Sequence, residues 1–458
     1  MKQNSDFVNQ PLLEIDLINY FHDGSKIKED WTIGTENEKF LYNKDNLLPI
    51  QYFGKNGIIE VFKILISEFS WQPIFEKENI IGLIDRENNK SISLEPGGQI
   101  ELSGAKCINL HQTFDEFSNY HKQLSLVSQK LDLGILGIGF CPDWKLSDMP
   151  KVPKSRYTVM REYMPTVGKY GLDMMHRTAT TQVNLDYSSE IDMQIKFKVA
   201  MALQPLVSMM FYNSPFKEGN LSGLYSYRSR VWNDTDPARS GYLPFVFDGS
   251  FDFRAYTQYA LDVPMYFIYR NSEYITPSKL TFRKFLSNGY QADNGLEYIA
   301  SLNDWEIHLS TLFPQVRLKK FIEMRGADSG NQNSIMSLAA VWTGLLYNQR
   351  SLDACHDIIS KWTFNDLLEL DSSLNSEGFN TKFKGYKITE LLLELLDLSK
   401  DGLRVRNIKN ASYQLEDIYL DQLFEIVKYK KTSADTLIDQ FTKLWSKDIR
   451  KIYNKYNL

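Results

Sequence analysis

Cysteine is scarce in this chain, with three residues in 458, and the three lie far apart at Cys107, Cys141 and Cys355. No Cys-x-x-Cys pair and no cysteine–histidine cluster with the spacing of zinc ligands is present. A disulfide framework and a zinc-finger type of site are therefore excluded. This usage is typical of a protein in a reducing compartment.

An excess of charge of one sign is also lacking. Lys and Arg number 52 and Asp and Glu number 57, so the net charge is -5. No overall positive field exists to attract nucleic acid or an anionic membrane, and neither is expected as a partner. A small anionic substrate would have to be bound by local arginines.

Long apolar runs are missing as well. The longest, LGILGIGF and the stretch 199–211, fall short of the roughly 20 residues that a membrane-spanning helix needs. The N-terminal segment carries Asp6, Glu14 and Asp16 and has no basic start followed by an apolar core, so neither a signal nor a transit peptide is expected. The sequence thus predicts a soluble, cytoplasmic protein.

Acidic and amide side chains stand two residues apart in four segments that have the character of strands. The pairs are Glu36 and Glu38, Gln99 and Glu101, Gln182 and Asn184, and Glu323 with Arg325. Residues at i and i+2 of a strand point to the same face, so one face of a sheet would be unusually polar. Such acids repel one another unless cations offset the charge, and Mg²⁺ bound through carboxylates and nucleotide phosphates is the usual solution.

The segment RTATTQVNLDY predicts the most informative strand. Its polar residues from Thr178 to Asp186 alternate with a second set that includes Val183 and Leu185. The apolar face can pack under helices while the polar face lines a cavity. A solvent-facing antiparallel strand would give the same alternation.

The remaining pattern predicts one α+β unit over residues 1–458 with a helical C-terminal part from about 335 to 458. Helical spacing is expected near the N-terminus and over 57–69, 110–131, 155–168 and 189–212. The segment IIGLIDRENNKSISLE indicates a hairpin, and Pro96-Gly97-Gly98 after it allows a tight bend. The irregular stretch NSPFKEGNLSGLYSYRSRVWNDTDPARSG has the length of a loop that carries binding residues.

A set of long motifs then indicates a family. The motifs are TENEKF, SLEPGGQIELSGA, RYTVMREYMP, LDMMHRTATTQVNLDY, RSRVWNDTDPARSG, YALDVPMYF, LNDWEIHLSTLFPQVRLKKFIEMRGAD and AAVWTGLLYN. Together they resemble the glutamate–cysteine ligases of plants and related bacteria. The resemblance implies a glutamine-synthetase-like core with a curved, mainly antiparallel sheet surrounded by helices. It also implies ATP, L-glutamate and L-cysteine as substrates, two or more Mg²⁺ ions, and a monomer or homodimer.

Such enzymes phosphorylate the side-chain carboxylate of glutamate with ATP, and the cysteine amine then displaces phosphate. The resemblance implies metal coordination by the oxygen-bearing side chains of Glu36, Glu38, Glu101, Gln182 and Glu323. Glu95 is either a further metal ligand or a partner that hydrogen-bonds to the ligands. It also implies that Arg325 stabilises the transferred phosphoryl group, and that Lys39 contacts ATP although a regular strand would point it to the opposite face. Glu323, Arg325 and Lys39 are thus the expected catalytic residues.

Substrate contacts are expected from three further side chains. Arg161 and Arg230 are the candidates for the carboxylates of glutamate, because a guanidinium binds carboxylate through two parallel hydrogen bonds. Tyr266 is the candidate for the cysteine pocket. For Arg161 a surface ion pair is an equally open alternative, and sequence does not separate Arg228 from Arg230. Tyr266 lies within an apolar run, and a tyrosine in such a run is more often part of the core than a ligand.

The chain departs from its plant counterparts in cysteine content. Those enzymes use cysteine pairs for redox control, whereas the position in HQTF holds Phe114 and no cysteine lies between EMRGAD and Cys355. A plant-like disulfide switch is therefore not expected.

Three competing functions remain open from the sequence. A ligase on the same scaffold would join glutamate to an amine other than cysteine. A glycoside hydrolase would use two of the glutamates as acid and nucleophile, and the surplus of acids and arginines speaks against it. A non-catalytic protein with the same fold would bind ligands without ATP turnover.

Overall fold

The computed structural model describes residues 12–249 and 251–455. The largest sheet of these residues has nine strands in the order β16-β17-β7-β1-β5-β4-β3-β2, with β6 paired to β1. Its strand pairs are antiparallel. The strands are β1 (Ile33–Asn43), β2 (Gln72–Glu76), β3 (Asn79–Asp85), β4 (Lys90–Leu94), β5 (Ile100–Ser103), β6 (Leu133–Leu136), β7 (Thr180–Leu185), β16 (Val316–Leu318) and β17 (Ile322–Asp328).

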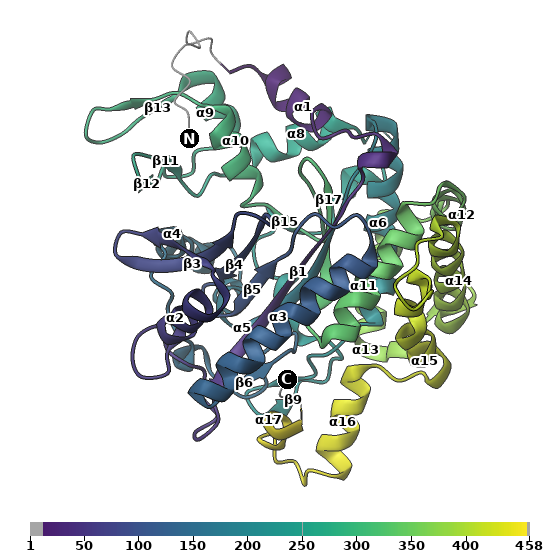
Figure 1. Ribbon diagram of the computed structural model, residues 1–458. Helices are drawn as coiled ribbons and strands as arrows, with labels where there is room; N and C mark the ends of the chain where they lie inside the picture. Colours follow the sequence, from purple (N-terminus) through teal and green to yellow (C-terminus); the bar gives the residue numbers. More distant parts are fainter. Residues whose placement is uncertain (1–11, 250, 456–458) are drawn as a thin grey trace.

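Some helices of the N-terminal two thirds pack on this sheet, and others pack on one another beside it (Figure 1). Helix α3 starts where the side chain of Asn109 accepts a hydrogen bond from the Gln112 amide, and it ends at Asp132 in the left-handed conformation. The helices are α1 (Glu14–His22), α2 (Ile58–Phe69), α3 (Leu110–Leu131), α4 (Ser155–Tyr163), α5 (Gly171–Arg177), α6 (Glu190–Met209), α7 (Tyr227–Trp232), α8 (Phe253–Asp262), α9 (Phe282–Asn288) and α10 (Leu302–Leu309).

The last third is mainly helical, as the sequence pattern predicts. Its helices are α11 (Gln332–Leu346), α12 (Gln349–Ile359), α13 (Phe364–Glu377), α14 (Ile388–Arg406), α15 (Asp421–Tyr429), α16 (Ser433–Lys443) and α17 (Lys451–Lys455). Short ribbons complete the fold: β8 (Phe216–Lys217) with β9 (Asn220–Leu221), β10 (Ser240–Gly241) with β15 (Phe313–Pro314), β11 (Ile268–Arg270) with β12 (Glu273–Ile275), β13 (Tyr290–Gln291) with β14 (Glu297–Tyr298), and β18 (Lys382–Phe383) with β19 (Tyr386–Lys387).

The sheet has one face packed under helices and one face turned to a cavity. Helices α3, α6 and α11 pack against the first face, and α3 and α11 run along β1 in Figure 1. One buried cluster joins the α6, α11 and α14 helices, and a second joins α2 and α3 to β3–β6. The expected α+β fold with a large antiparallel sheet is confirmed, while the division into a single domain stays a prediction.

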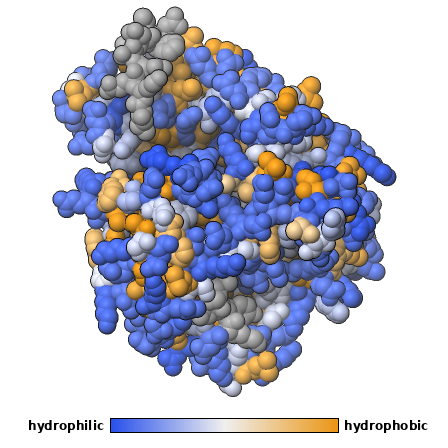
Figure 2. All heavy atoms as spheres, viewed as in Figure 1, coloured by the Kyte–Doolittle hydropathy of each residue, from blue (hydrophilic) through white to orange (hydrophobic). Residues whose placement is uncertain are grey.

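The surface seen in Figure 2 is mostly hydrophilic, with apolar side chains in small separate groups. Within residues 12–249 and 251–455, no helix combines the length and the apolar character needed to cross a bilayer. Cys107, Cys141 and Cys355 are all buried and free.

Candidate active site

A polar cavity of about 360 Å³ lies on the open face of the sheet. It takes side chains from six neighbouring strands, β16, β17, β7, β1, β5 and β4, and from the helices that face them. The charged and amide side chains that line it are Glu36, Glu38, Glu95, Gln99, Glu101, Lys154, Arg156, Gln182, Arg317, Lys319 and Arg325.

Strand register brings the acids together. Glu38 of β1 lies directly opposite Glu101 of β5, and Glu36 lies opposite Gln182 of β7. Cross-strand partners on one face stand about 5 Å apart at Cβ, so three strands contribute neighbouring oxygen atoms. The i, i+2 pattern in the sequence therefore predicted the shared face correctly.

The turn Pro96-Gly97-Gly98 carries Glu95 into the cavity and is clamped against α5. The Glu95 amide donates to the Gln99 carbonyl at 2.9 Å, and Gln99 Nε2 donates to the Thr178 carbonyl at 2.7 Å. A Cβ on Gly97 would lie 2.2 Å from the carbonyl oxygen of His176, so only glycine permits this approach.

The acids sit in an environment that disfavours their ionised forms. Burial, followed by repulsion from Glu95, raises the pKa of Glu38 to about 8. Burial and the charge of Glu36 and its neighbours raise the pKa of Glu101 well above its ordinary value. Burial and Glu323 raise the pKa of Glu36. A cation placed among these carboxylates would reverse these shifts.

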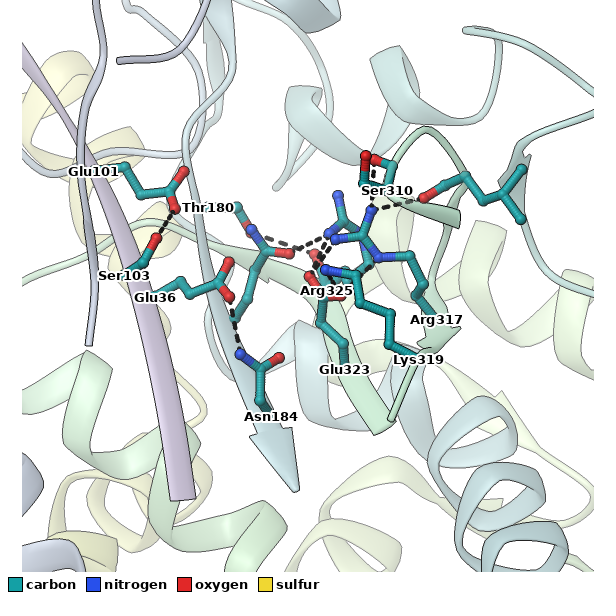
Figure 3. Close-up of polar contacts among 12 residues, drawn as sticks. Glu36, Glu101, Ser103, Thr180, Asn184, Ser310, Arg317, Lys319, Glu323 and Arg325 are labelled. Atoms are coloured by element: carbon teal, nitrogen blue, oxygen red, sulfur yellow. Dashed lines mark hydrogen bonds and ion pairs between the residues drawn. The ribbon is translucent and has the colours of Figure 1, made fainter. Parts of the chain in front are cut away.

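A cationic group stands beside the acids at the β16–β17 edge (Figure 3). Arg317 holds both oxygens of Glu323 at 2.6 and 2.8 Å, and Arg325 Nη1 donates to the same carboxylate at 2.6 Å. Lys319 Nζ lies 3.6 Å from it. Although burial acts to raise the pKa of Glu323, the three cations hold it far below its ordinary value.

Glu323 is thus placed differently from the sequence-based prediction of a metal ligand. Both of its oxygens accept hydrogen bonds from guanidinium groups, and its side chain is fully buried. In this arrangement it is the counter-charge that fixes Arg317 and Arg325. Arg325 also donates to Gln182 Oε1, so the oxygen of Gln182 is engaged as well.

Lys39 lies outside the cavity, on the opposite face of β1. Its Nζ donates to the Gly330 carbonyl at 2.6 Å between α3 and α11, and burial lowers its pKa to about 7. The alternation of β1 makes this unavoidable, because Glu36 and Glu38 face the cavity. The structure therefore does not bring Lys39 to the acidic cavity, and its contact with ATP stays a prediction.

Arg161, Arg230 and Tyr266 also do not line the acidic cavity. Arg161 faces a separate cavity on the other side of α4. Arg230 projects from α7 to the surface, 3.9 Å from Asp234. Tyr266 is buried behind the wall, where its hydroxyl contacts Met164 Sδ and its ring lies against Arg239. Arg161 and Arg230 are helical, and sequence spacing did not show which direction a single helical residue faces. Tyr266 lies in the segment between α8 and β11, where no regular period indicates the direction of a side chain.

Three basic residues of the cavity were missed by the sequence interpretation: Lys154, Arg317 and Lys319. Arg317 and Lys319 share a face at i and i+2 in VRLKKF, the same signal that identified the acids. Lys154 and Arg156 stand at the start of α4, on the far side of β5 from the β16–β17 group. Arg156 Nε is buried and makes no hydrogen bond within the described residues, so it is free to bind a ligand.

The acids do not form a ready-made metal centre. In the described part of the chain, no three His, Cys, Asp or Glu side chains are grouped closely enough to hold an ion by themselves. Mg²⁺ usually binds through one or two carboxylates and completes its shell with water and phosphate oxygens. The cavity fits that mode, in which the metal arrives with a phosphorylated ligand, and it does not fit a dedicated protein cage.

The arrangement is suited to holding dense negative charge. Carboxylates occupy the centre of the cavity, and guanidinium or ammonium groups stand at both sides of them. An anion bound in the cavity would meet cations on either side of the carboxylates. Preorganised charges of this kind stabilise transferred phosphoryl groups and oxyanions.

Comparison with known proteins gives consistent results. The profile of Glutamate-cysteine ligase family 2 (GCS2) matches residues 32–455. The chain is 45% identical to glutamate–cysteine ligase B, chloroplastic, of Oryza sativa subsp. japonica, over 98% of this chain and 88% of that protein. It is 44% identical to glutamate–cysteine ligase, chloroplastic, of Arabidopsis thaliana, over 97% and 83% of the two chains.

Two solved structures share the fold. The glutamate–cysteine ligase of Francisella tularensis in complex with AMP superimposes with a TM-score of 0.54 at 14% identity, over 94% of this chain and 89% of that one. A bifunctional glutathione synthetase from Pasteurella multocida gives 0.50 at 14% identity, over 97% and 54%. At this identity the likeness extends to the fold alone.

The names of the curated relatives overturn one expectation. Several relatives at 43–45% identity are described as chloroplastic, which contradicts the cytoplasmic location predicted from composition. Scarce cysteine indicates a reducing environment and does not distinguish one such compartment from another.

Proposed function

The chain belongs to glutamate–cysteine ligase family 2, and from this we propose how its acidic cavity serves the reaction. The enzyme joins the side-chain carboxylate of L-glutamate to the amine of L-cysteine at the expense of ATP and yields γ-glutamylcysteine. The observation that carries the assignment of the site is the row of carboxylates on one sheet face with cations on both sides.

Glu36, Glu38, Glu95 and Glu101 are the side chains that would hold Mg²⁺ together with the phosphates of ATP. The raised pKa values of Glu36, Glu38 and Glu101 support this, because a cation among these carboxylates would relieve their mutual repulsion. When bound, the metal neutralises the phosphate oxygens and orients the γ-phosphate toward the glutamate carboxylate.

Arg325, Arg317 and Lys319 are proposed to bind the phosphoryl group as it is transferred. Glu323 holds Arg317 and Arg325 in place through three hydrogen bonds of 2.6 to 2.8 Å, so these donors need not reorganise during the reaction. Transfer to glutamate gives an acyl phosphate, and attack by the cysteine amine expels phosphate. The same cations then stabilise the tetrahedral oxyanion and the leaving phosphate.

Arg156 and Lys154 are proposed to bind the carboxylate of an amino-acid substrate. They replace Arg161 and Arg230 in this role, because they line the cavity and the unpartnered Nε of Arg156 needs an acceptor. The ring of Tyr157 and the side chains of Met160 and Met174 complete this wall with apolar surface. A substrate lying between the two cationic groups would bring its side-chain carboxylate to the metal-binding acids.

A product assay tests the function directly. ADP release is measured with Mg²⁺, ATP and L-glutamate, adding L-cysteine, ammonia or a small amine, and the product is identified by mass spectrometry. We expect turnover that depends on L-cysteine and a product with the mass of γ-glutamylcysteine. Equal turnover with ammonia would instead indicate a ligase for another amine.

Substitution of a proposed metal ligand tests the site. Glu101→Gln removes one charge and keeps the shape, so the apparent affinity for Mg²⁺ is expected to fall roughly 10- to 100-fold, with activity partly restored at high Mg²⁺. The variant should be at least as heat-stable as the parent, because an ionised carboxylate is disfavoured at this position.

The matched control is Glu369→Gln, since Glu369 is exposed on α13 and outside the cavity. It should leave Mg²⁺ dependence unchanged. Unaltered Mg²⁺ dependence in Glu101→Gln as well would remove Glu101 from the metal site.

A further inference from the structure

A second cavity, of about 670 Å³, lies on the other side of the wall formed by α4 and α5. Because side chains point in different directions around a helix, α4 and α5 each have some residues that face the acidic cavity and others that face the second cavity. Tyr157 and Met160 of α4 face the acidic cavity, whereas Thr158 and Arg161 face the second one. The two cavities share no lining residue. The second cavity is lined by Leu146, Ser147, Met149, Lys151, Thr158, Arg161, Glu162, Leu172 and His176.

The cations of the second cavity lack anionic partners. Within residues 12–249 and 251–455, neither Lys151 nor Arg161 has a carboxylate oxygen within 4.0 Å. Arg161 Nη2 donates to Thr158 Oγ1 at 3.0 Å, while its Nη1 is buried and donates no hydrogen bond. A buried donor without an acceptor is costly, and an anion placed in the cavity would satisfy it.

Glu162 is the one acid among the lining residues, and its charge acts on Arg161, but its oxygens lie beyond 4.0 Å from the nitrogens of Arg161 and Lys151. The remaining lining residues are neutral or apolar. His176 is buried, and burial together with the charges of Arg161 and Lys151 lowers its pKa to about 4, so the ring is uncharged at neutral pH. Leu146, Met149 and Leu172 supply apolar surface. A cavity of this size with apolar walls and a few convergent polar groups is the usual form of a small-molecule site.

We propose that this second cavity binds a small organic anion. Its carboxylate or phosphate group would be held by Arg161, with Lys151 and the hydroxyl of Thr158 nearby. Its apolar part would lie against Leu146, Met149 and Leu172. The site is separate from the acidic cavity, and its ligand does not compete with the substrates of the ligase reaction.

Calorimetric titration tests the proposal with three defined probes: butanoate, butyl phosphate and inorganic phosphate. The acidic cavity is first filled with Mg²⁺, a non-hydrolysable ATP analogue and L-glutamate, so that its own cations are occupied. We expect saturable binding of one molecule of butanoate or butyl phosphate, whichever head group the site prefers, and weaker binding of inorganic phosphate, which has no apolar part.

Arg161→Gln should weaken that binding at least about tenfold, because the charge and one of the paired donors are lost. The control Arg350→Gln, at an exposed position on α12, should bind like the parent. Thr158→Val, at an exposed position whose change does not threaten folding, should weaken binding to a smaller extent.

Three outcomes would overturn the proposal. They are the failure of all three probes to bind saturably, equal affinities in Arg161→Gln and Arg350→Gln, and the loss of binding once the acidic cavity is filled. None of these measurements depends on turnover, so they stand apart from the test of the ligase reaction.

Discussion

At the scale of single residues, burial and partners decide what a titratable side chain can do. Glu323 and Glu101 are both glutamates on strands that border the same cavity. Three cations hold the pKa of Glu323 far below its ordinary value, whereas burial and neighbouring acids raise that of Glu101. The first is therefore a fixed counter-charge, and the second is available to a metal ion. The sequence motif alone makes them look alike.

His308 offers a residue-scale prediction for the pH dependence of stability. Burial lowers its pKa from 6.5 to about 3, and its Nε2 contacts the Ala260 carbonyl at 2.8 Å. The unfolded chain takes up a proton below pH 6.5 and the folded chain does not, so stability is lost as the pH falls. Because of this histidine, the free energy of unfolding of the unsubstituted protein should fall by about 1.4 kcal/mol between pH 7.5 and pH 5.5.

The test is to measure the free energy of unfolding in urea at pH 7.5 and at pH 5.5. The decrease between the two pH values should be smaller in His308→Gln than in the unsubstituted protein, by about 1.4 kcal/mol. His22→Gln, at an exposed position, should keep the loss of the parent. An identical loss in His308→Gln and the parent would show that His308 is protonated in the folded state.

At the scale of elements, regular hydrophobic spacing gave reliable predictions and irregular segments did not. The predicted helix 110–131 matches α3, and the strands at TENEKF and TTQVNL match β1 and β7. Their residues alternate or repeat with one clear period, which local geometry imposes. The apolar run LGILGIGF forms a strand only over Leu133–Leu136, because β1 pairs with just these four residues.

A close helix crossing gives a prediction at this scale. Helices α11 and α14 touch through Gly344 and Gly402, where a Cβ on Gly402 would lie 2.0 Å from the Gly344 carbonyl oxygen. Gly402→Ala should separate the helices and lower the unfolding free energy by about 1–3 kcal/mol. The Mg²⁺ dependence of the folded enzyme should stay unchanged, because the crossing is outside the acidic cavity.

Asp401→Ala, an exposed neighbour on α14, is the control and should have little effect on stability. Denaturation in urea measures both variants. Equal stability of Gly402→Ala and the parent would mean that the two helices can move apart at no cost.

At the scale of the whole molecule, the C-terminal end of the described chain packs against β1, the first strand of the sheet. The hydroxyl of Tyr42 in β1 donates to the Tyr453 carbonyl of α17 at 2.7 Å, and the ring of Tyr453 stacks on Trp144. Ile449, Ile452 and Tyr453 are all buried in the core cluster that contains β1. The C-terminal helix thus covers the strand that carries Glu36 and Glu38.

Ending the chain at Asp448 should strongly destabilise the protein. Loss of the buried surface of Ile449, Ile452 and Tyr453 removes about 5 kcal/mol of hydrophobic stabilisation. The midpoint of thermal unfolding should fall, and ligase activity should be lost at a lower temperature. Lys451→Ala, an exposed position on the same helix, should unfold like the parent. An unchanged midpoint after truncation would show that β1 does not depend on this cover.

The sequence by itself determined the elements, the polar face of the sheet and the family. Each of these depends on short-range periodicity or on contiguous motifs, as Glu36, Glu38, Glu101 and Gln182 illustrate. Strand alternation also fixed the side of β1 on which Lys39 lies.

Only the tertiary structure decided which cations meet the acids. Arg317, Lys319, Lys154 and Arg156 reach the cavity because strand order and the direction of α4 place them there, whereas Arg161 turns to a second cavity five residues after Arg156. The physical reason is that charge interactions act across space between segments far apart in the chain. Their sign and strength follow from burial and distance, which packing alone sets.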